Sequence, residues 1–167
     1  MIPDDPLLLS FGLIWRFSDA QKYAQLSEAE FRRFRPLSEP ESLSQWEQHV
    51  YPDASSRNRH LGELYVQRLI RWPEIPSFKS ESHQEEIDVV PNLQRRIIAS
   101  DSDEVDFFWH AEMAARTDWR LFLDHWNDFC YASDDSNILV LPMVGKAVAY
   151  IEERWYVLDR QTKATVF

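Results

Sequence analysis

Apolar residues recur along this chain with two spacings, and each spacing predicts a different kind of element. Apolar positions three or four residues apart are typical of one face of a helix, whereas short β-branched and aromatic runs are typical of strands. Helical spacing occurs over residues 27–34, 38–50, 60–71 and 117–129. Strand-prone runs occur over residues 12–17, 105–110, 137–141, 146–152 and 155–160. The chain is therefore predicted to mix helices with strands.

Two of the expected helices have a recognisable beginning. Ser27 and Glu30 have the spacing of a capping box, in which the serine hydroxyl accepts an early backbone N–H and the glutamate reaches back. Ser38 and Glu41 repeat that spacing. Both sites are predicted to start a helix.

The C-terminal half indicates the fold class. Residues 117–129, which Thr117 is predicted to cap, carry the clearest apolar stripe: Trp119, Phe122, Leu123, Trp126 and Phe129. Turn signals at 142–145 and 152–154 separate the three strand-prone runs that follow, which favours an antiparallel meander. We predict an α+β fold, in which helices pack on a small antiparallel sheet with a C-terminal β-meander.

A single domain is predicted over residues 1–167, because this length suits one core and neither half of the chain is clearly self-sufficient. Pro73, Pro76 and Pro91 stand among serines and glutamates. Residues 73–91 are therefore expected to form a polar loop within the domain.

The composition excludes several classes of protein. Hydrophobic residues make up 44% of the chain, which excludes a disordered tail. Cys130 is the single cysteine, so multi-cysteine metal sites are excluded and a reducing cytoplasm is the expected location. Apolar runs stay well below the roughly 20 residues that span a bilayer, and the apolar start follows Asp4 and Asp5, unlike a signal peptide. No contact with a membrane is expected.

Negative charge is concentrated in the middle of the sequence. The whole chain has a net charge of −10, and residues 73–135, with five basic and fifteen acidic side chains, carry that entire excess. Residues 1–72 are close to neutral, as are residues 136–167. Such a block opposes direct binding of nucleic acid and favours either a solvated loop or a surface for a cationic partner.

Two segments match part of a metal-binding motif, but each lacks other residues that the metal site needs. His110 and Glu112 have the spacing of zinc deaminases, whose chemistry needs two further thiolate ligands that a chain with one cysteine lacks. Residues 101–112 place acids as in a calcium-binding EF-hand, but Asp106 stands where that loop needs glycine. We predict no metal and no cofactor.

A carboxylate-dependent enzyme is the alternative that the residues leave open. Asp101, Asp103 and Val105 match the nucleophile signature of haloacid-dehalogenase-like phosphatases, in which one aspartate attacks phosphorus. Asp134 and Asp135 form a second carboxylate pair. The chain that follows is predicted to form one helix and a meander rather than the βα units of that fold. The sequence contains no other recognisable set of catalytic residues, so a non-enzymatic role is favoured.

The aromatic pattern resembles a known family. The residues that carry the resemblance are Trp15, Phe17, Arg35-Pro-Leu37, Trp46, Thr117-Asp-Trp-Arg-Leu-Phe-Leu-Asp-His-Trp-Asn-Asp-Phe129, Asp134-Asp135, Ala147-Val148 and Arg160. In this order they are similar to an uncharacterised gammaproteobacterial domain-of-unknown-function family, number two-nine-four-seven in that series. The resemblance runs over most of the chain and implies a bacterial, cytoplasmic α+β domain, with no activity that it assigns to particular residues.

These observations favour an acidic protein that binds another protein. Most concretely, we expect an immunity-type inhibitor that occludes a basic toxin, which could be a nuclease, because an acidic surface complements a cationic cleft. The residues predicted to bind the partner are Asp101, Asp103, Glu104, Asp106, Asp134 and Asp135. The alternatives are a small carboxylate-dependent hydrolase or phosphatase and an adaptor or structural module.

Overall fold

The structure is a computed structural model that describes residues 17, 26–50, 77–79, 83–130, 136–151 and 154–159. The expected helix over 60–71 and most of the expected strand over 12–17 lie outside these residues. Among the described helices, none is long and apolar enough to cross a membrane.

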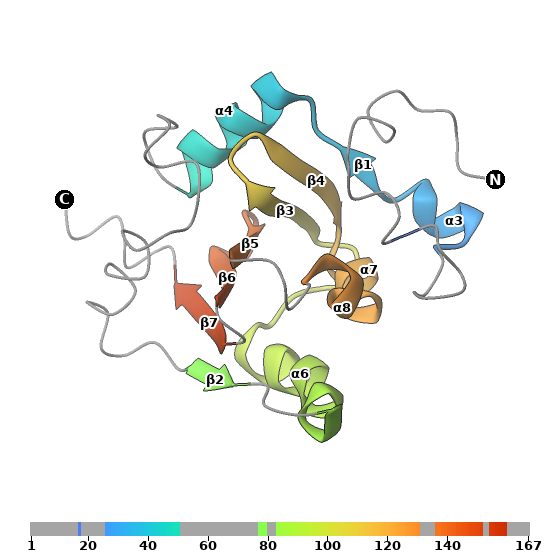
Figure 1. The fold of residues 1–167 in the computed structure, drawn as a ribbon, viewed down its shortest axis with the longest axis vertical. Coiled ribbons are helices and arrows are strands. Elements are labelled where there is room, and N and C mark those ends of the chain that lie inside the picture. Colours follow the sequence, from blue (N-terminus) through green and yellow to red (C-terminus); the bar gives the residue numbers. More distant parts are fainter. Residues whose placement is uncertain are drawn as a thin grey trace.

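An antiparallel sheet is the centre of the fold, as predicted (Figure 1). Its described strands are β1 (Arg35–Pro36), β2 (Ser77–Lys79), β3 (Glu104–His110), β4 (Met113–Asp118), β5 (Ser136–Leu141), β6 (Lys146–Ile151) and β7 (Arg154–Asp159). They lie in the order β1-β4-β3-β5-β6-β7-β2, so consecutive strands β5, β6 and β7 form the C-terminal meander that the turn signals predicted. Gly145, at a φ of 68°, adopts the left-handed conformation that the β5–β6 turn requires.

Five helices are described: α3 (Glu28–Phe31), α4 (Glu39–His49), α6 (His83–Arg96), α7 (Trp119–Asp124) and α8 (Trp126–Phe129). Both predicted capping boxes are present. The Ser27 N–H donates to Glu30 Oε2 at 2.7 Å, and the Ser38 N–H donates to Glu41 Oε2 at 2.9 Å. Together with the sheet, these helices confirm the α+β class.

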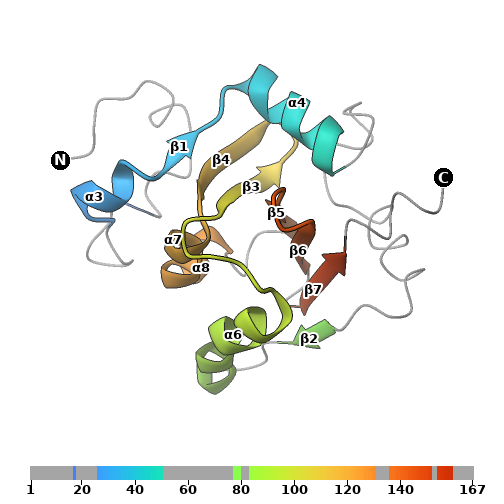
Figure 2. The same ribbon diagram turned by 180° about the vertical axis from the view of Figure 1, so that it is seen from behind.

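The two faces of the sheet bury separate apolar clusters, which makes the fold three layers deep. One face carries the larger cluster and is packed by side chains of α3, α6, α7 and α8. The other face meets α4, whose Trp46 packs edge-on against Phe108 of β3 at a ring-centroid distance of 5.5 Å. Figures 1 and 2 show α4 on one side of β3 and β4, with α7 and α8 on the other. Residues on the central strands are consequently buried in both directions.

The predicted helix over 117–129 is shorter and interrupted. Residues through Asp118 belong to β4, and Asp118 rather than Thr117 caps α7, accepting the Leu121 N–H at 2.9 Å. His125 then leaves helical geometry at φ −127° and ψ 22°, which separates α7 from α8. The break changes the phase of the apolar stripe, so Phe129 is fully buried while Trp126 is only half-buried.

The polar loop expected over 73–91 is replaced in part by regular structure. Residues 77–79 form edge strand β2, and α6 begins at residue 83 with Pro91 inside it. Proline normally disfavours a helix interior. Val89, Leu93 and Ile97, four residues apart, are all buried in the larger cluster, and this packing outweighs the local preference.

Candidate functional site

The acidic segment predicted to bind a partner begins at a turn anchored to α7. Within the turn, the Asp103 N–H donates to Ser100 O at 2.9 Å and the Ser100 N–H donates to Asp103 Oδ2 at 2.7 Å. Asp103 O then accepts the Trp119 N–H at 2.9 Å, and Asp101 O accepts the Arg120 N–H at 3.0 Å. The backbone of the turn is thus fixed from both sides, while the side chain of Asp101 is exposed.

Asp106 does not belong to the exposed surface with which the sequence grouped it. It is 0% exposed and receives a bidentate pair from Arg116, with Nε to Oδ1 at 2.7 Å and Nη2 to Oδ2 at 2.9 Å. The physical reason is that the middle of β3 is covered on both faces, so Asp106, like Phe108 two residues on, points into the layer beneath α4 rather than into water. This hydrogen bond to Asp106 raises the pKa of Arg116.

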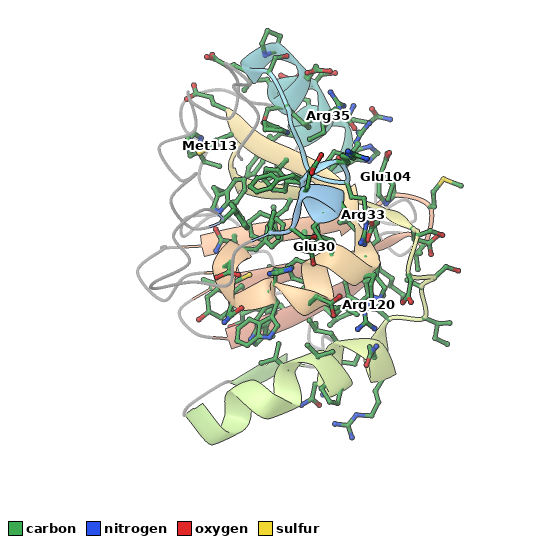
Figure 3. The ribbon with its side chains drawn as sticks, turned by 90° about the vertical axis from the view of Figure 1, so that its right-hand side faces the viewer. Glu30, Arg33, Arg35, Glu104, Met113 and Arg120 are labelled. Atoms are coloured by element: carbon green, nitrogen blue, oxygen red, sulfur yellow. The ribbon has the colours of Figure 1, made fainter. Side chains whose placement is uncertain are left out.

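Arginines pair with several of the other acids in this region, so the surface is mixed rather than uniformly negative. Glu104 lies 3.2 Å from Arg116 Nε, and Arg120 contacts Asp124 at 2.8 Å. Arg33 makes a bidentate pair with Asp118, and although burial opposes it, this pair lowers the pKa of Asp118. Figure 3 shows Arg35, Glu104, Arg33, Glu30 and Arg120 along one side of the molecule, with Met113 on the opposite side.

Two large apolar side chains are exposed in segments that adjoin the start of β3, one along the chain and one across the sheet. Ile98 is 90% exposed and Met143 is 83% exposed, and they are the large hydrophobic residues exposed among the described part of the chain. Ile98 leads into the anchored turn. Met143 lies in the β5–β6 turn, which reaches the start of β3 because β5 and β3 are antiparallel with Val140 opposite Asp106. An isolated exposed apolar residue has no periodic signal, so the sequence pattern does not reveal either side chain.

A small pocket opens between β1, β4 and the first turns of α4. Its volume is about 290 Å³. The residues that line it are Arg35, Leu37, Pro40, Glu41, Ser44, Gln45 and Arg116. Arg35 Nη1 contacts Glu41 Oε1 at 3.1 Å, and the backbone N–H of Ser38, its hydroxyl and Arg35 lower the pKa of Glu41 to about 2. Two guanidinium groups and one ionised carboxylate therefore border the pocket.

A third group of polar residues is buried where α3 meets α8. His125 is 7% exposed, its Nε2 lies 2.9 Å from Glu30 Oε1, and its Nδ1 lies 3.3 Å from Asp128 Oδ2. Hydrogen bonding to Asp128 and then to Glu30 raises the pKa of His125, although burial opposes the shift. Burial acts to raise the pKa of Glu30 as well, but the hydrogen bonds from His125 and Ser27 prevail and lower it to about 2. The charged imidazolium thus bridges two carboxylates.

Replacing His125 with Gln is expected to lower stability in a pH-dependent way, by about 1.5–3 kcal/mol at most, as for a charged hydrogen bond. The imidazolium contributes fully below its unfolded pKa near 6.5, and this contribution is lost as the pH rises through the raised folded value. The Glu30 contribution is present above 4.5 and is lost as the pH falls toward about 2. The gap in urea midpoint between wild type and variant should therefore be largest between these limits and shrink at alkaline pH. The control is Glu28→Gln, which removes an exposed pair with Arg32. If the difference in urea midpoint for His125→Gln varied with pH no more than that for the control, the bridge would be contradicted.

The remaining candidates from the sequence belong to three different segments of the chain. His110 is the last residue of β3 and Glu112 lies in the turn that follows, where the Glu112 N–H donates to His110 Nδ1 at 3.3 Å. Asp101 and Asp103 precede a strand of an antiparallel sheet, whereas open α/β folds place their ligands beyond the carboxyl ends of parallel strands. Asp134 and Asp135 lie outside the described residues. Within the described ranges, no three His, Cys, Asp or Glu side chains are grouped so as to hold a metal ion.

Comparison with known proteins bears on the family alone. A family model described as a protein of unknown function (DUF2947) matches residues 7–167, which is nearly the whole chain. This match confirms the resemblance seen in the aromatic pattern. No curated protein matches the chain.

Proposed function

We propose that this chain, which belongs to the DUF2947 family of proteins of unknown function, is a binding protein for a basic protein partner. In its most concrete form the proposal is a cytoplasmic, immunity-type inhibitor that occludes the cationic cleft of a toxin, for example a nuclease. The observation that supports it best is the pairing of an almost fully exposed Ile98 with the exposed Asp101 on a turn whose backbone is anchored to α7.

This surface combines exposed apolar side chains with exposed charged ones, as protein interfaces do. Most of the binding free energy at such an interface comes from apolar side chains that are removed from water. Charged groups at the rim determine the orientation and the choice of partner. Ile98 and Met143 are the apolar candidates, with Asp101 and Glu104 as the exposed acids near them. Because the turn is already ordered, binding would cost little additional conformational entropy.

The role of each predicted residue follows from its surroundings. Asp101 and Glu104 would meet the partner directly, and Asp103 would support them by holding the turn through Ser100. Asp106 would act only through Arg116. Asp134 and Asp135 stay in the proposal on sequence grounds, as further acids of the block.

The net charge is expected to determine how fast the partner associates and how strongly this rate depends on salt. A chain of net charge −10 attracts a basic protein over long range, which raises the association rate at low salt. Neutralising rim acids should therefore slow association and weaken its salt dependence, with a smaller effect on dissociation.

A pull-down from the native host cell tests the proposal, with Asp101→Asn and Glu104→Gln combined in one variant and Ile98→Ser as a second. Both are expected to lose retention of the partner, with stability changed by less than about 0.5 kcal/mol because these side chains are exposed. The matched control is Glu28→Gln with Glu39→Gln, which removes the same charge from exposed positions on α3 and α4.

Equal retention of one partner by wild type and both variants would contradict the proposal. So would the absence of any protein partner together with turnover of a phosphate ester that Asp101→Asn abolishes, since that result is the one expected of the carboxylate-dependent hydrolase.

A further inference from the structure

We infer that the buried layer between α4 and the sheet binds an internal water molecule, held by the hydroxyl of Ser42 and the indole N–H of Trp46. The inference does not depend on the proposed function, because it concerns side chains inside the molecule rather than the exposed turn. It starts from two buried polar atoms, Ser42 Oγ and Trp46 Nε1, which have no hydrogen-bond partner within the part of the chain that the structure describes. The two residues are 0% and 1% exposed.

Both side chains lie on the inner face of α4. Ser42 and Trp46 are four residues apart, so they share one face of the helix. Helical side chains lean back toward the N-terminus, which directs Trp46 over the turn that carries Ser42. On that face Trp46 packs edge-on against Phe108, and the other buried members of its cluster, such as Leu37 and Ala114, carry hydrocarbon side chains. The two polar atoms thus lie one helical turn apart in an apolar layer.

Leaving these two atoms without a partner would be costly. A buried polar group that loses its hydrogen bond lowers the folding equilibrium constant by a factor of roughly 5–150. A serine inside a helix commonly donates to the carbonyl four residues before it, but the Ser42 hydroxyl does not. Where no protein group is within reach, native proteins usually pair such atoms with ordered water. An internal water is therefore the expected partner.

The chemistry of the two atoms favours water over other ligands. An indole N–H can only donate, so its partner must accept a hydrogen bond and cannot be a metal cation, whereas a hydroxyl can donate or accept. A buried anion would need a compensating cation, and Arg116, which points into the same layer, is already paired with Asp106. The near-zero exposure of Ser42 and Trp46 leaves no opening for an organic molecule. Water is small, neutral and able to both donate and accept.

The first test is the direction in which Ser42→Ala changes stability. The matched control is Ser44→Ala, because Ser44 is exposed on the same helix and reports the gain in helix propensity alone. If water is bound, Ser42→Ala loses a hydrogen bond, and its unfolding equilibrium constant should be about fivefold higher than that of the control. If the layer is dry, the change removes an unsatisfied hydroxyl, and the constant should be lower than that of the control. Urea unfolding followed by tryptophan fluorescence measures both constants.

The second test counts the water directly. Relaxation dispersion of ¹⁷O-labelled water detects internal waters that stay bound for longer than bulk water does. Ser42→Ala should hold one long-lived water fewer than the wild type, whereas Ser44→Ala should hold the same number. Trp46→Phe, which removes the N–H and keeps an aromatic ring, should lose the same water, so the count does not rest on a single variant.

Two results would each overturn the inference. One is a Ser42→Ala variant that is at least as stable as Ser44→Ala. The other is an equal number of long-lived waters in the wild type, Ser42→Ala and Trp46→Phe.

Discussion

Replacing Phe129 with Ala is expected to lower the free energy of unfolding by about 3–5 kcal/mol, the scale for truncating a large buried aromatic side chain. Phe129 is 0% exposed and lies at the centre of the aromatic packing beneath the sheet. Its ring lies 5.0–6.1 Å, centroid to centroid, from the rings of Phe17, Phe34, Phe107, Trp109 and Phe122. Truncation leaves these five rings facing an empty volume that the surrounding backbone can fill only in part.

Urea unfolding followed by tryptophan fluorescence measures this effect. Met143→Ala is the control, because an 83% exposed side chain contributes little to the core and should shift the free energy by less than about 0.5 kcal/mol. A loss below about 1 kcal/mol for Phe129→Ala would show that α8 does not pack as described.

Replacing Asp106 with Ala is expected to destabilise the protein by about 3 kcal/mol, the lower end of the cost of breaking a buried pair, because the partly buried Arg116 that remains keeps only the half-exposed Glu104 as a partner. The cost comes from breaking the pair rather than from the absence of charge. Replacing both residues at once, with Asp106→Leu and Arg116→Met, should therefore recover most of the lost stability, as well-packed apolar residues often replace a buried pair without penalty.

A double-mutant cycle of urea midpoints measures the coupling between these two residues. Asp124→Ala is the control, since its pair with Arg120 is exposed and is worth about 0–1 kcal/mol. Additive losses from the single changes at Asp106 and Arg116 would show that the two side chains act separately, contrary to the bidentate geometry.

The parts of the fold that follow from local chemistry could be predicted from the sequence. The capping boxes at Ser27 and Ser38 involve residues three positions apart, and β3 and the meander are short apolar runs bounded by turn residues. Such signals depend only on neighbours along the chain, so they survive without knowledge of the tertiary structure. The α+β class followed from them.

The parts that were missed depend on contacts between distant segments. Strand β4 contains Arg116, Thr117 and Asp118, which favour a turn or a helix start when read alone, and pairing with β1 and β3 overrides that preference. Helix α6 contains Pro91 and was expected to be a loop, because nothing local reveals that its apolar residues meet the sheet.

The candidate site shows the same division. Asp101 and Asp103 were recognised as part of a dense acidic block, but the burial of Asp106 depends on Arg116, which lies across the sheet. Its position inside a run of apolar residues, between Val105 and Phe107, was the available signal for a strand covered on both faces. The partner of His125, Glu30, lies 95 positions away in the sequence, so no local pattern reveals the buried contact between them.

The two edge strands have a consequence for the order in which the molecule assembles. Strands β3 and β4, like β5, β6 and β7, pair with neighbours in sequence, so little loop entropy is lost when they close. Strand β1 instead joins Arg35 to Arg116, and β2 joins Ser77 to Tyr156, each through only a few paired residues. Closing such a long loop costs entropy and forms only a few strand pairs, so these pairings are expected late in folding. By then the hairpins have formed the surface on which the edge strands dock. Strands β1 and β2, in the N-terminal half, would then pair only after β4 and β7 have been synthesised. The newly made protein would therefore complete its sheet only after the C-terminal strands have emerged.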